Sequence, residues 1–478
     1  DKTGAFEEKE YELVANSKNN YITIPDDFAK TINMIEESYY KKVDDETFYF
    51  DKDDYSYSFT GWKVNNASIL TPSETVFQPG DSVSIDTLLA FDTDKDGIIE
   101  LDALWGKVLY VQNPYSTMYY TDYWIIDYDK TKTYDKTGSW NYKYENNVLT
   151  LNDGKNKENP LCSLDYAYYL LYQEDVTNNF SNANSKNSYE NVLMLTGDLN
   201  YVKSSDNGSK QANYFKAYDL YDGSTFDETK NYIFGDHIAQ QRSFGYVSYY
   251  TKSGVLSTKD VGSNNTYAPS VTFKSYNNNQ FNLYINGHGY YDFTYNSIRV
   301  DNVYYRAITN NFKPNQSSPV TVGSETAFSG SNKSYLEFTK RANARGFSVL
   351  RTNTVQTVVL NGGTFPSWQT SWSTSQESKK YNYELHWYMG QNATVTGPIT
   401  LGTTAPYENS KPIISQDFKF VITGGTVKDI FGGSYGINSK SIGKREITVI
   451  GDGTNNIATN PKITNIYGAA KSGTFTGD

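Results

Sequence analysis

The amino-acid sequence predicts an all-β protein with a minor helical part. Short apolar runs and alternating apolar and polar residues recur between turn residues along nearly the whole chain, which is the pattern of strands. The 35 glycines, together with abundant Asn and Ser, supply the turns between such strands. Aromatic residues form 16% of the chain, including 44 tyrosines, and give the strands large side chains to bury.

Amphipathic helix patterns are found in two segments. Residues 27–40 place apolar side chains along one stripe behind Asp27, which is suited to cap the helix start. Residues 164–173 do the same behind Ser163, another good cap. We therefore expect two helices in a chain that is otherwise made of strands.

Composition excludes several functional classes. The 478 residues hold 43 Lys and Arg against 54 Asp and Glu, a net charge of −11, which argues against a nucleic-acid partner. The single cysteine, Cys162, excludes an intramolecular disulfide framework and a zinc site built from several cysteines. The sequence contains no apolar run of about eighteen residues, so we expect no membrane insertion.

The chain divides into three parts by its sequence patterns. We expect a first β module at residues 1–107, an aromatic-rich β connector at 108–162, and a stack of short strands at 163–478. The segment 472–478 is too short and glycine-rich to cap a strand stack, so we expect the natural protein to continue further.

The first module contains three ordered aromatic and turn motifs, SFTGW at 58–62, FQPGDSV at 77–83 and LDALW at 101–105. They predict a small sheet in which Trp62 and Trp105 pack inward and Pro79-Gly80 reverses the chain. The order of these motifs resembles the Listeria–Bacteroides repeat, the B-repeat module of internalin-type surface proteins. That resemblance implies a β-grasp-like spacer of Gram-positive adhesins, a stalk or binding module without catalysis.

The sequence departs from that repeat by an additional acidic loop, DTDKDGIIELD at 92–102. Aspartates at its first, third and fifth positions, with Gly97 at the sixth, resemble the start of a calcium-binding loop. The twelfth position, where a bidentate Glu belongs, is Ala103, so the standard loop is incomplete. A solvated acidic turn without metal is the alternative. The calcium ligands would be Asp92, Asp94, Asp96, Ile98, Glu100 and Asp102.

The connector concentrates aromatic residues on alternating segments. Aromatic rings on one strand face suit stacking against sugar rings, and a buried seam between modules is the alternative. The candidate ligand-binding residues are Tyr119, Tyr120, Tyr123, Trp124 and Trp140.

The third part shows echoes that are typical of stacked coils. VVLNGGTF at 358–365 resembles VITGGTV at 421–427, and IFGG at 430–433 resembles IYGA at 466–469. A helix followed by a VLML strand at 192–195 also resembles the start of pectate-lyase-like right-handed parallel β-helices, and the glycine-rich pattern resembles those of large bacterial surface adhesins. The resemblance implies a parallel β-helix over 163–478, with tandem β-sandwiches as the competing architecture.

Chemistry-bearing residues are sparse. The histidines, His237, His288 and His386, are far apart, and the common nucleotide, zinc-protease and serine-hydrolase motifs are absent from the sequence. The best enzymatic pattern is DFTYNSIRVDNVYYR, since β-helix lyases pair acids with a basic Arg. A salt-bridged strand face is the alternative interpretation. The catalytic candidates of that pattern are Asp292, Arg299, Asp301 and Arg306.

These patterns favour an extracellular adhesin fragment on the surface of a low-GC Gram-positive bacterium. It would bind a host glycan, a mucin or a host protein such as an immunoglobulin, without turnover and with no cofactor other than calcium. A polysaccharide lyase or glycoside hydrolase on the same fold is one alternative, and a purely structural stalk is another.

Overall fold

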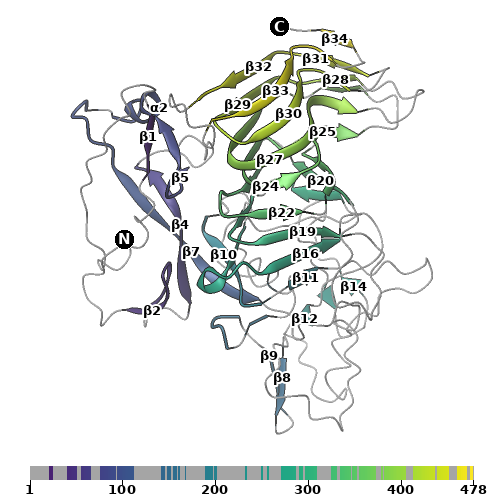
Figure 1. Cartoon of the computed structure of the whole chain (residues 1–478). Helices are drawn as coiled ribbons and strands as arrows, with labels where there is room; N and C mark the ends of the chain where they lie inside the picture. The colour runs from purple at the N-terminus through teal and green to yellow at the C-terminus, as the bar shows by residue number, and fades with distance from the viewer. Residues whose placement is uncertain are drawn as a thin grey trace.

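The computed structural model describes residues 21–24, 40–50, 55–65, 76–92, 94–111, 142–145, 148–151, 154–158, 160–161, 167, 189–197, 199–201, 232–233, 249–250, 256–257, 271–286, 290–293, 297–308, 324–330, 334–345, 347–352, 355–372, 378–380, 382–404, 413–435, 439–451, 460–470 and 474–476. Within these residues the regular structure is nearly all strand, as the sequence predicts (Figure 1). The exceptions are the short helix α2 (Ile85–Leu89), a 3₁₀ turn (Tyr276–Asn278) and the single helical residue Ala167.

The two predicted helices fall almost entirely outside the described residues. The prediction for 27–40 touches them only at Tyr40, where strand β2 begins. Within 164–173 the structure describes Ala167, which is helical and fully buried. The helix α2 was not expected from the sequence.

The first module is an antiparallel sheet. Its strands pair in the order β2 to β3 to β4, and β4 also pairs with β5 and β7. Gly80 adopts a φ of 79° between β5 and β6, which confirms the predicted chain reversal. These strands are β2 (Tyr40–Asp44), β3 (Thr47–Phe50), β4 (Ser56–Val64), β5 (Val76–Phe77), β7 (Leu101–Val111), and the separate pair β1 (Tyr21–Thr23) with β6 (Ser82–Ser84).

The predicted inward packing of the two tryptophans is observed as an aromatic cluster. Phe59 contacts Trp62 with ring centroids 5.2 Å apart and Trp105 with centroids 5.8 Å apart. Phe48 adds a third edge contact to Trp105 at 5.6 Å. Both tryptophans remain partly exposed.

Strand β7 joins the first module to the rest of the chain. Its first residues pair antiparallel with β4, and Lys107–Val111 pair parallel with β10. The boundary predicted at residue 107 therefore lies inside a continuous strand. Because one strand belongs to both sheets, the two parts are connected by backbone hydrogen bonds as well as by the chain.

The remaining strands form ladders of parallel pairs. The first ladder runs through β7, β10 (Asn191–Leu195), β15 (Val271–Ser275), β18 (Ser297–Asp301), β21 (Tyr335–Phe338), β24 (Thr357–Phe365), β27 (Leu385–Thr404), β29 (Phe418–Ile422) and β32 (Arg445–Val449). The second runs through β17 (Tyr290–Phe293), β20 (Ser324–Gly330), β23 (Phe347–Arg351), β25 (Trp368–Trp372), β27, β30 (Thr426–Phe431) and β33 (Lys462–Tyr467).

Two shorter parallel ladders complete the stack. One contains β11 (Leu199–Tyr201), β16 (Asn282–Asn286), β19 (Tyr304–Ile308) and β22 (Asn343–Arg345). The other contains β26 (Ser378–Lys380), β28 (Ile413–Ser415), β31 (Lys440–Ile442) and β34 (Thr474–Thr476). Antiparallel pairs outside the stack are β8 (Tyr142–Glu145) with β9 (Val148–Leu151), and β13 (Tyr249–Tyr250) with β12 (Tyr232–Ile233) and β14 (Leu256–Ser257).

The core is a column of apolar side chains that repeats from strand to strand. In the first ladder one in-register column reads Leu109, Leu193, Phe273, Val300, Phe338, Leu360, Met389, Ile422 and Val449. All but the last are buried. Full burial of one such side chain contributes roughly 1.5–3 kcal/mol. The column therefore explains why strands far apart in sequence stack in register.

A stacked pair of tryptophans lies in the same hydrophobic core as this column. The rings of Trp368 and Trp387 lie 4.0 Å apart at 13°, and both residues are fully buried. They come from different ladders, so their contact joins two walls of the stack across the core.

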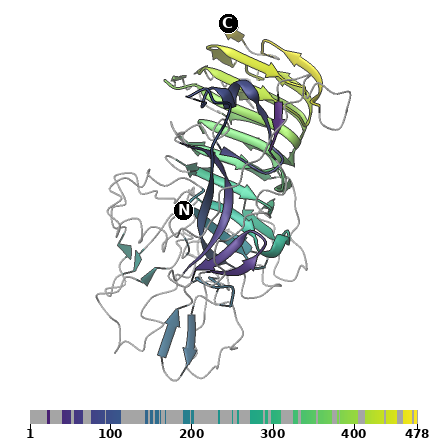
Figure 2. The same ribbon diagram turned by 90° about the vertical axis from the view of Figure 1, so that its left-hand side faces the viewer.

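The first module covers one outer wall of this stack (Figure 2). Strand side chains alternate between faces, so the outward residues of the first ladder would ordinarily meet solvent. Here Thr272, Lys274, Arg299 and Glu337 are buried beneath the module.

Candidate functional site

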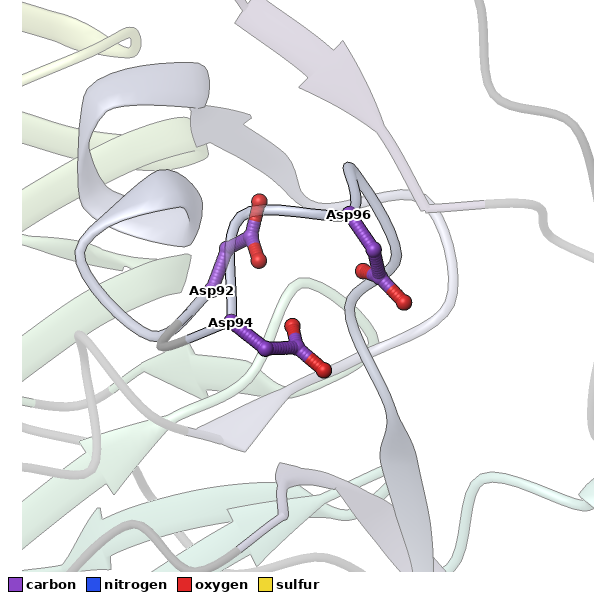
Figure 3. Close-up of side chains that lie close together, drawn as sticks. All are labelled: Asp92, Asp94 and Asp96. Carbon is purple, nitrogen blue, oxygen red and sulfur yellow. The ribbon is translucent and has the colours of Figure 1, made fainter.

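The acidic loop brings three carboxylates together (Figure 3). The side chains of Asp92, Asp94 and Asp96 lie with ligand oxygens within 4.8 Å of one another. The loop follows α2, and Gly97 at its turn has a φ of 81°, a conformation that glycine adopts without strain. Its tight turn is what directs three alternate aspartates to one side.

Backbone hydrogen bonds hold two of these carboxylates in place. Gly97 donates its N–H to Asp92 Oδ2 at 3.0 Å, and Ile98 donates to Asp96 Oδ1 at 2.8 Å. The other oxygen of Asp92 is buried and accepts no hydrogen bond from the described residues. A carboxylate oxygen in that state fits a hard cation with oxygen ligands, as calcium prefers.

The other predicted ligands lie differently. Glu100 accepts a hydrogen bond from the Asn65 side chain at 2.6 Å, and Asp102 is exposed on β7 opposite Lys63. Neither belongs to the carboxylate cluster, and Ile98 could contribute only its backbone carbonyl. The fit to calcium therefore rests on three aspartates.

The outer wall of the first ladder holds a buried charge network beneath the first module. Glu46, in the β2–β3 turn, forms ion pairs with Lys274 and with Arg341, the latter through two bonds of 2.7 and 3.2 Å. Arg341 also donates to Asp301, at 3.0 Å from its Nε. Lys274 continues into the module, donating to Ser58 Oγ at 2.9 Å and to the Phe59 carbonyl at 3.0 Å. This network joins the module to strands β15 and β18 of the ladder and to the turn that follows β21.

A second buried cluster surrounds Arg299, which is fully buried. Its Nε donates to Glu337 at 2.9 Å, and its guanidinium lies 5.0 Å from the centre of the Tyr189 ring. Tyr335 donates to the same carboxylate at 2.8 Å. Glu337 thus neutralises a cation that has no access to water.

Burial and charge shift the acidities of these groups in opposite directions. Burial would raise the pKa of Glu46, but attraction by Lys274 and Arg341 outweighs it and lowers the pKa to about 2. The same balance holds the pKa of Asp301 well below its usual range. Asp81, on the module's turn, behaves oppositely, because burial and the nearby Glu337 raise its pKa to about 7.

Two of the four catalytic candidates, Arg299 and Asp301, occupy positions that a dissolved substrate does not reach. Arg299 and Asp301 share one face of β18, as the sequence suggested, but they are 0% and 1% exposed under the first module. Asp292 lies on β17 and Arg306 on β19, so the four residues come from three strands. The salt-bridged strand face that the sequence offered as an alternative is what β18 displays.

The remaining predicted residues have no clustered role in the described part of the chain. His386 lies 2.9 Å from Glu384 on the same strand region and is partly buried. His237, His288 and the aromatic candidates Tyr119, Tyr120, Tyr123, Trp124 and Trp140 lie outside the described residues.

Of the charge network, sequence reasoning singled out Asp301 but not Glu46, Lys274 or Arg341. A signal was nevertheless present, since Lys274 and Asp301 each follow a large apolar residue on a short alternating strand, VTFKS and SIRVD. A charge at such a position, on a wall covered by another element, requires a partner.

Comparison with protein families, curated proteins and solved structures finds no match to this chain. Among the described residues, no helix is long and apolar enough to cross a membrane.

Proposed function

We propose that this chain is part of a bacterial cell-surface adhesin that binds a host ligand without chemical turnover. The ligand classes are a host glycan, a mucin or a host protein such as an immunoglobulin. The protein presents its binding surfaces on a stiff body, which keeps the entropic cost of binding low.

We interpret the ladders as a right-handed parallel β-helix and the first module as a β-grasp-like spacer of the Listeria–Bacteroides type. The parallel pairing from β7 to β33 supports the first part of this interpretation. Tandem β-sandwiches, the competing architecture, are built from antiparallel sheets. The module's antiparallel sheet and its Gly80 turn agree with the second part.

One observation carries the proposal, namely the fixed attachment of the module to the stack. Strand β7 runs through both, and the ion pairs of Glu46 with Lys274 and Arg341 lie buried between them. A spacer joined in this way fixes the orientation of the stack relative to the module. A fixed orientation suits a protein that presents a binding face to its ligand.

The enzymatic alternative has no such support. A lyase or hydrolase needs an acid and a base that reach the polysaccharide. Arg299 and Asp301 are buried and engaged in structural ion pairs. A purely structural stalk is the remaining alternative, and a binding experiment distinguishes it from an adhesin.

The test is a glycan array run beside a pulldown from host secretions, with and without a calcium chelator. Polysaccharide chain length is measured in parallel. The adhesin proposal predicts binding with unchanged chain length. Shortened chains would indicate an enzyme, and absence of any ligand in both assays would indicate a stalk.

A further inference from the structure

A shallow hollow lies on the outer surface of the last coils of the stack. Its volume is about 380 Å³, and it is open to solvent along one side. It is formed by corresponding segments of β27, β30 and β33, which pair in parallel register. The middle residues of these segments, Val395, Val427 and Ile463, point toward the core and form the base.

Two rows of outward side chains border this base. Thr394 pairs with Thr426, which pairs with Lys462, and Thr364 extends the same row by one strand. Neighbouring strands lie about 4.8 Å apart and alternate residues about 6.6 Å apart, so the outward side chains form a grid. A shift in the register of β27 between Val395 and Pro398 offsets Thr396 from the row that holds Lys428. The six outward residues of the hollow are Thr394, Thr396, Thr426, Lys428, Lys462 and Thr464.

The grid is free of internal partners. Within the described part of the chain, none of its four threonine hydroxyls takes part in a hydrogen bond and neither lysine forms an ion pair. The nearest carboxylate in sequence, Asp429, accepts a hydrogen bond from Asn465 at 2.8 Å. Among the described residues, two ammonium groups without an ion pair thus stand among hydroxyls, on a protein with a net charge of −11.

We propose that this hollow binds an acidic polysaccharide. Threonine hydroxyls both donate and accept hydrogen bonds, as the hydroxyl groups of sugars require. Lys428 and Lys462 supply the positive charges that attract sulfate or carboxylate groups. A shallow, open hollow suits an extended chain that continues beyond it on both sides. This inference rests on the proposed adhesive function and names one ligand class for it.

The test uses the full chain and three probes in calorimetric titrations. Chondroitin sulfate carries sulfates and carboxylates, polygalacturonate carries carboxylates only, and dextran is uncharged. We expect the first or second to bind with an affinity that falls with added salt, and dextran not to bind. Comparison of the two acidic probes shows whether the hollow requires sulfate groups or binds carboxylate groups alone.

The variants locate the binding to the hollow. The double variant K428A/K462A should lose about tenfold in affinity, as expected for two exposed charge contacts. The control K41A/K440A removes two lysines that also lack ion pairs among the described residues but lie outside the hollow. It should bind as wild type does. T396V/T464V, which leaves the charge unchanged, should weaken binding by a smaller factor.

Several outcomes overturn the proposal. Equal losses of affinity in the two double-lysine variants would show attraction by net charge alone. Wild-type affinity in T396V/T464V would show that these two hydroxyls take no part in recognition. If neither acidic probe binds, the hollow is not a site for acidic polysaccharides. If K428A/K462A still binds ligands from the array or pulldown, the adhesin proposal survives without this site. If wild type binds nothing in any assay, both proposals fail.

Discussion

Glu337 is the residue on which the buried cluster around Arg299 depends. Its carboxylate accepts hydrogen bonds from Arg299 and Tyr335 in a region closed to solvent. Replacing Glu337 with Gln removes the carboxylate that is ion-paired with the buried guanidinium of Arg299. We expect a loss of about 3–5 kcal/mol in the free energy of unfolding, measured by denaturant titration.

Lys444 provides the matched control for that substitution. Its ion pair with Glu446 has a similar length, 2.9 Å, but its side chain is 60% exposed. Replacing Lys444 with Met should leave the free energy of unfolding unchanged within error. Equal effects of the two substitutions would show that the Arg299 cluster is not buried as described.

Asp81 predicts a pH dependence of stability. Its pKa rises from 3.8 to about 7 on folding, so the folded state holds a proton that the unfolded state releases. Stability from this group is therefore lost as pH rises from about 4 to 7. Glu46 acts in the opposite sense, because its lowered pKa removes stability only as pH falls below its ordinary value of 4.5.

The variant Asp81→Asn isolates this contribution. Thermal unfolding midpoints of wild type and D81N are compared from pH 5 to pH 8, where Glu46 stays ionised in both states. The wild-type midpoint should fall relative to that of D81N as pH rises. A difference that stays constant across this range would contradict the raised pKa.

The sequence predicted which residues share a face of a strand, but not whether that face is exposed to solvent. The alternation of β18 correctly placed Arg299 and Asp301 on one face. Whether that face meets solvent or a covering module depends on contacts with residues more than two hundred positions earlier, which alternation does not encode.

At the scale of elements, glycines with a positive φ test the close stacking of successive strands. Gly425 has a φ of 83°, and a Cβ there would lie 2.6 Å from the backbone oxygens of Gly390 and Ala393 on strand β27. The substitution G425A should therefore destabilise the protein through both backbone strain and steric conflict, by roughly 2–4 kcal/mol.

A substitution at Gly97 distinguishes backbone strain from steric conflict as causes of the loss in stability. It has nearly the same φ, 81°, but an added Cβ would meet no atom within 4 Å. In calcium-free buffer G97A should cost only the backbone term, about 1 kcal/mol. Comparable losses for the two variants in denaturant titrations would contradict close contact between coils at Gly425.

The calcium prediction for the acidic loop remains to be tested. Calcium should raise the thermal unfolding midpoint of the first module, because binding to the folded state stabilises it. Replacing Asp94 and Asp96 with Asn should abolish this shift, whereas replacing Asp86, an exposed aspartate of α2, should not. An unchanged wild-type midpoint at millimolar calcium would leave the loop an ordinary acidic turn.

The sequence echoes predicted the register of the last coils. Ile430 and Phe431 pair with Ile466 and Tyr467, as the resemblance of the two motifs indicated. The GGT motifs at 362–364 and 424–426 also align, two strands apart, through Thr394. Earlier coils lack glycine corners at fixed spacing, and their strands carry no repeated motif by which the register would be read.

At the scale of the whole molecule, the first module and the stack form one body. The sequence indicated both parts but not the contact between them. The charged residues of the ladder and the sheet that covers them lie far apart in the sequence, and no sequence pattern relates one to the other. The boundary at 107 was placed at the last motif of the module, whereas β7 continues through it into the ladder.

The most direct test of the account measures the distance between the module and the end of the stack. Nitroxide labels are placed at Asp86 on α2 and Thr464 on β33, both exposed, in a chain whose Cys162 is replaced by Ser. A single narrow distance distribution is predicted, because β7 and the buried ion pairs of Glu46 fix the two parts together. A broad distribution would contradict the account, since it would show a module that moves freely on the stack.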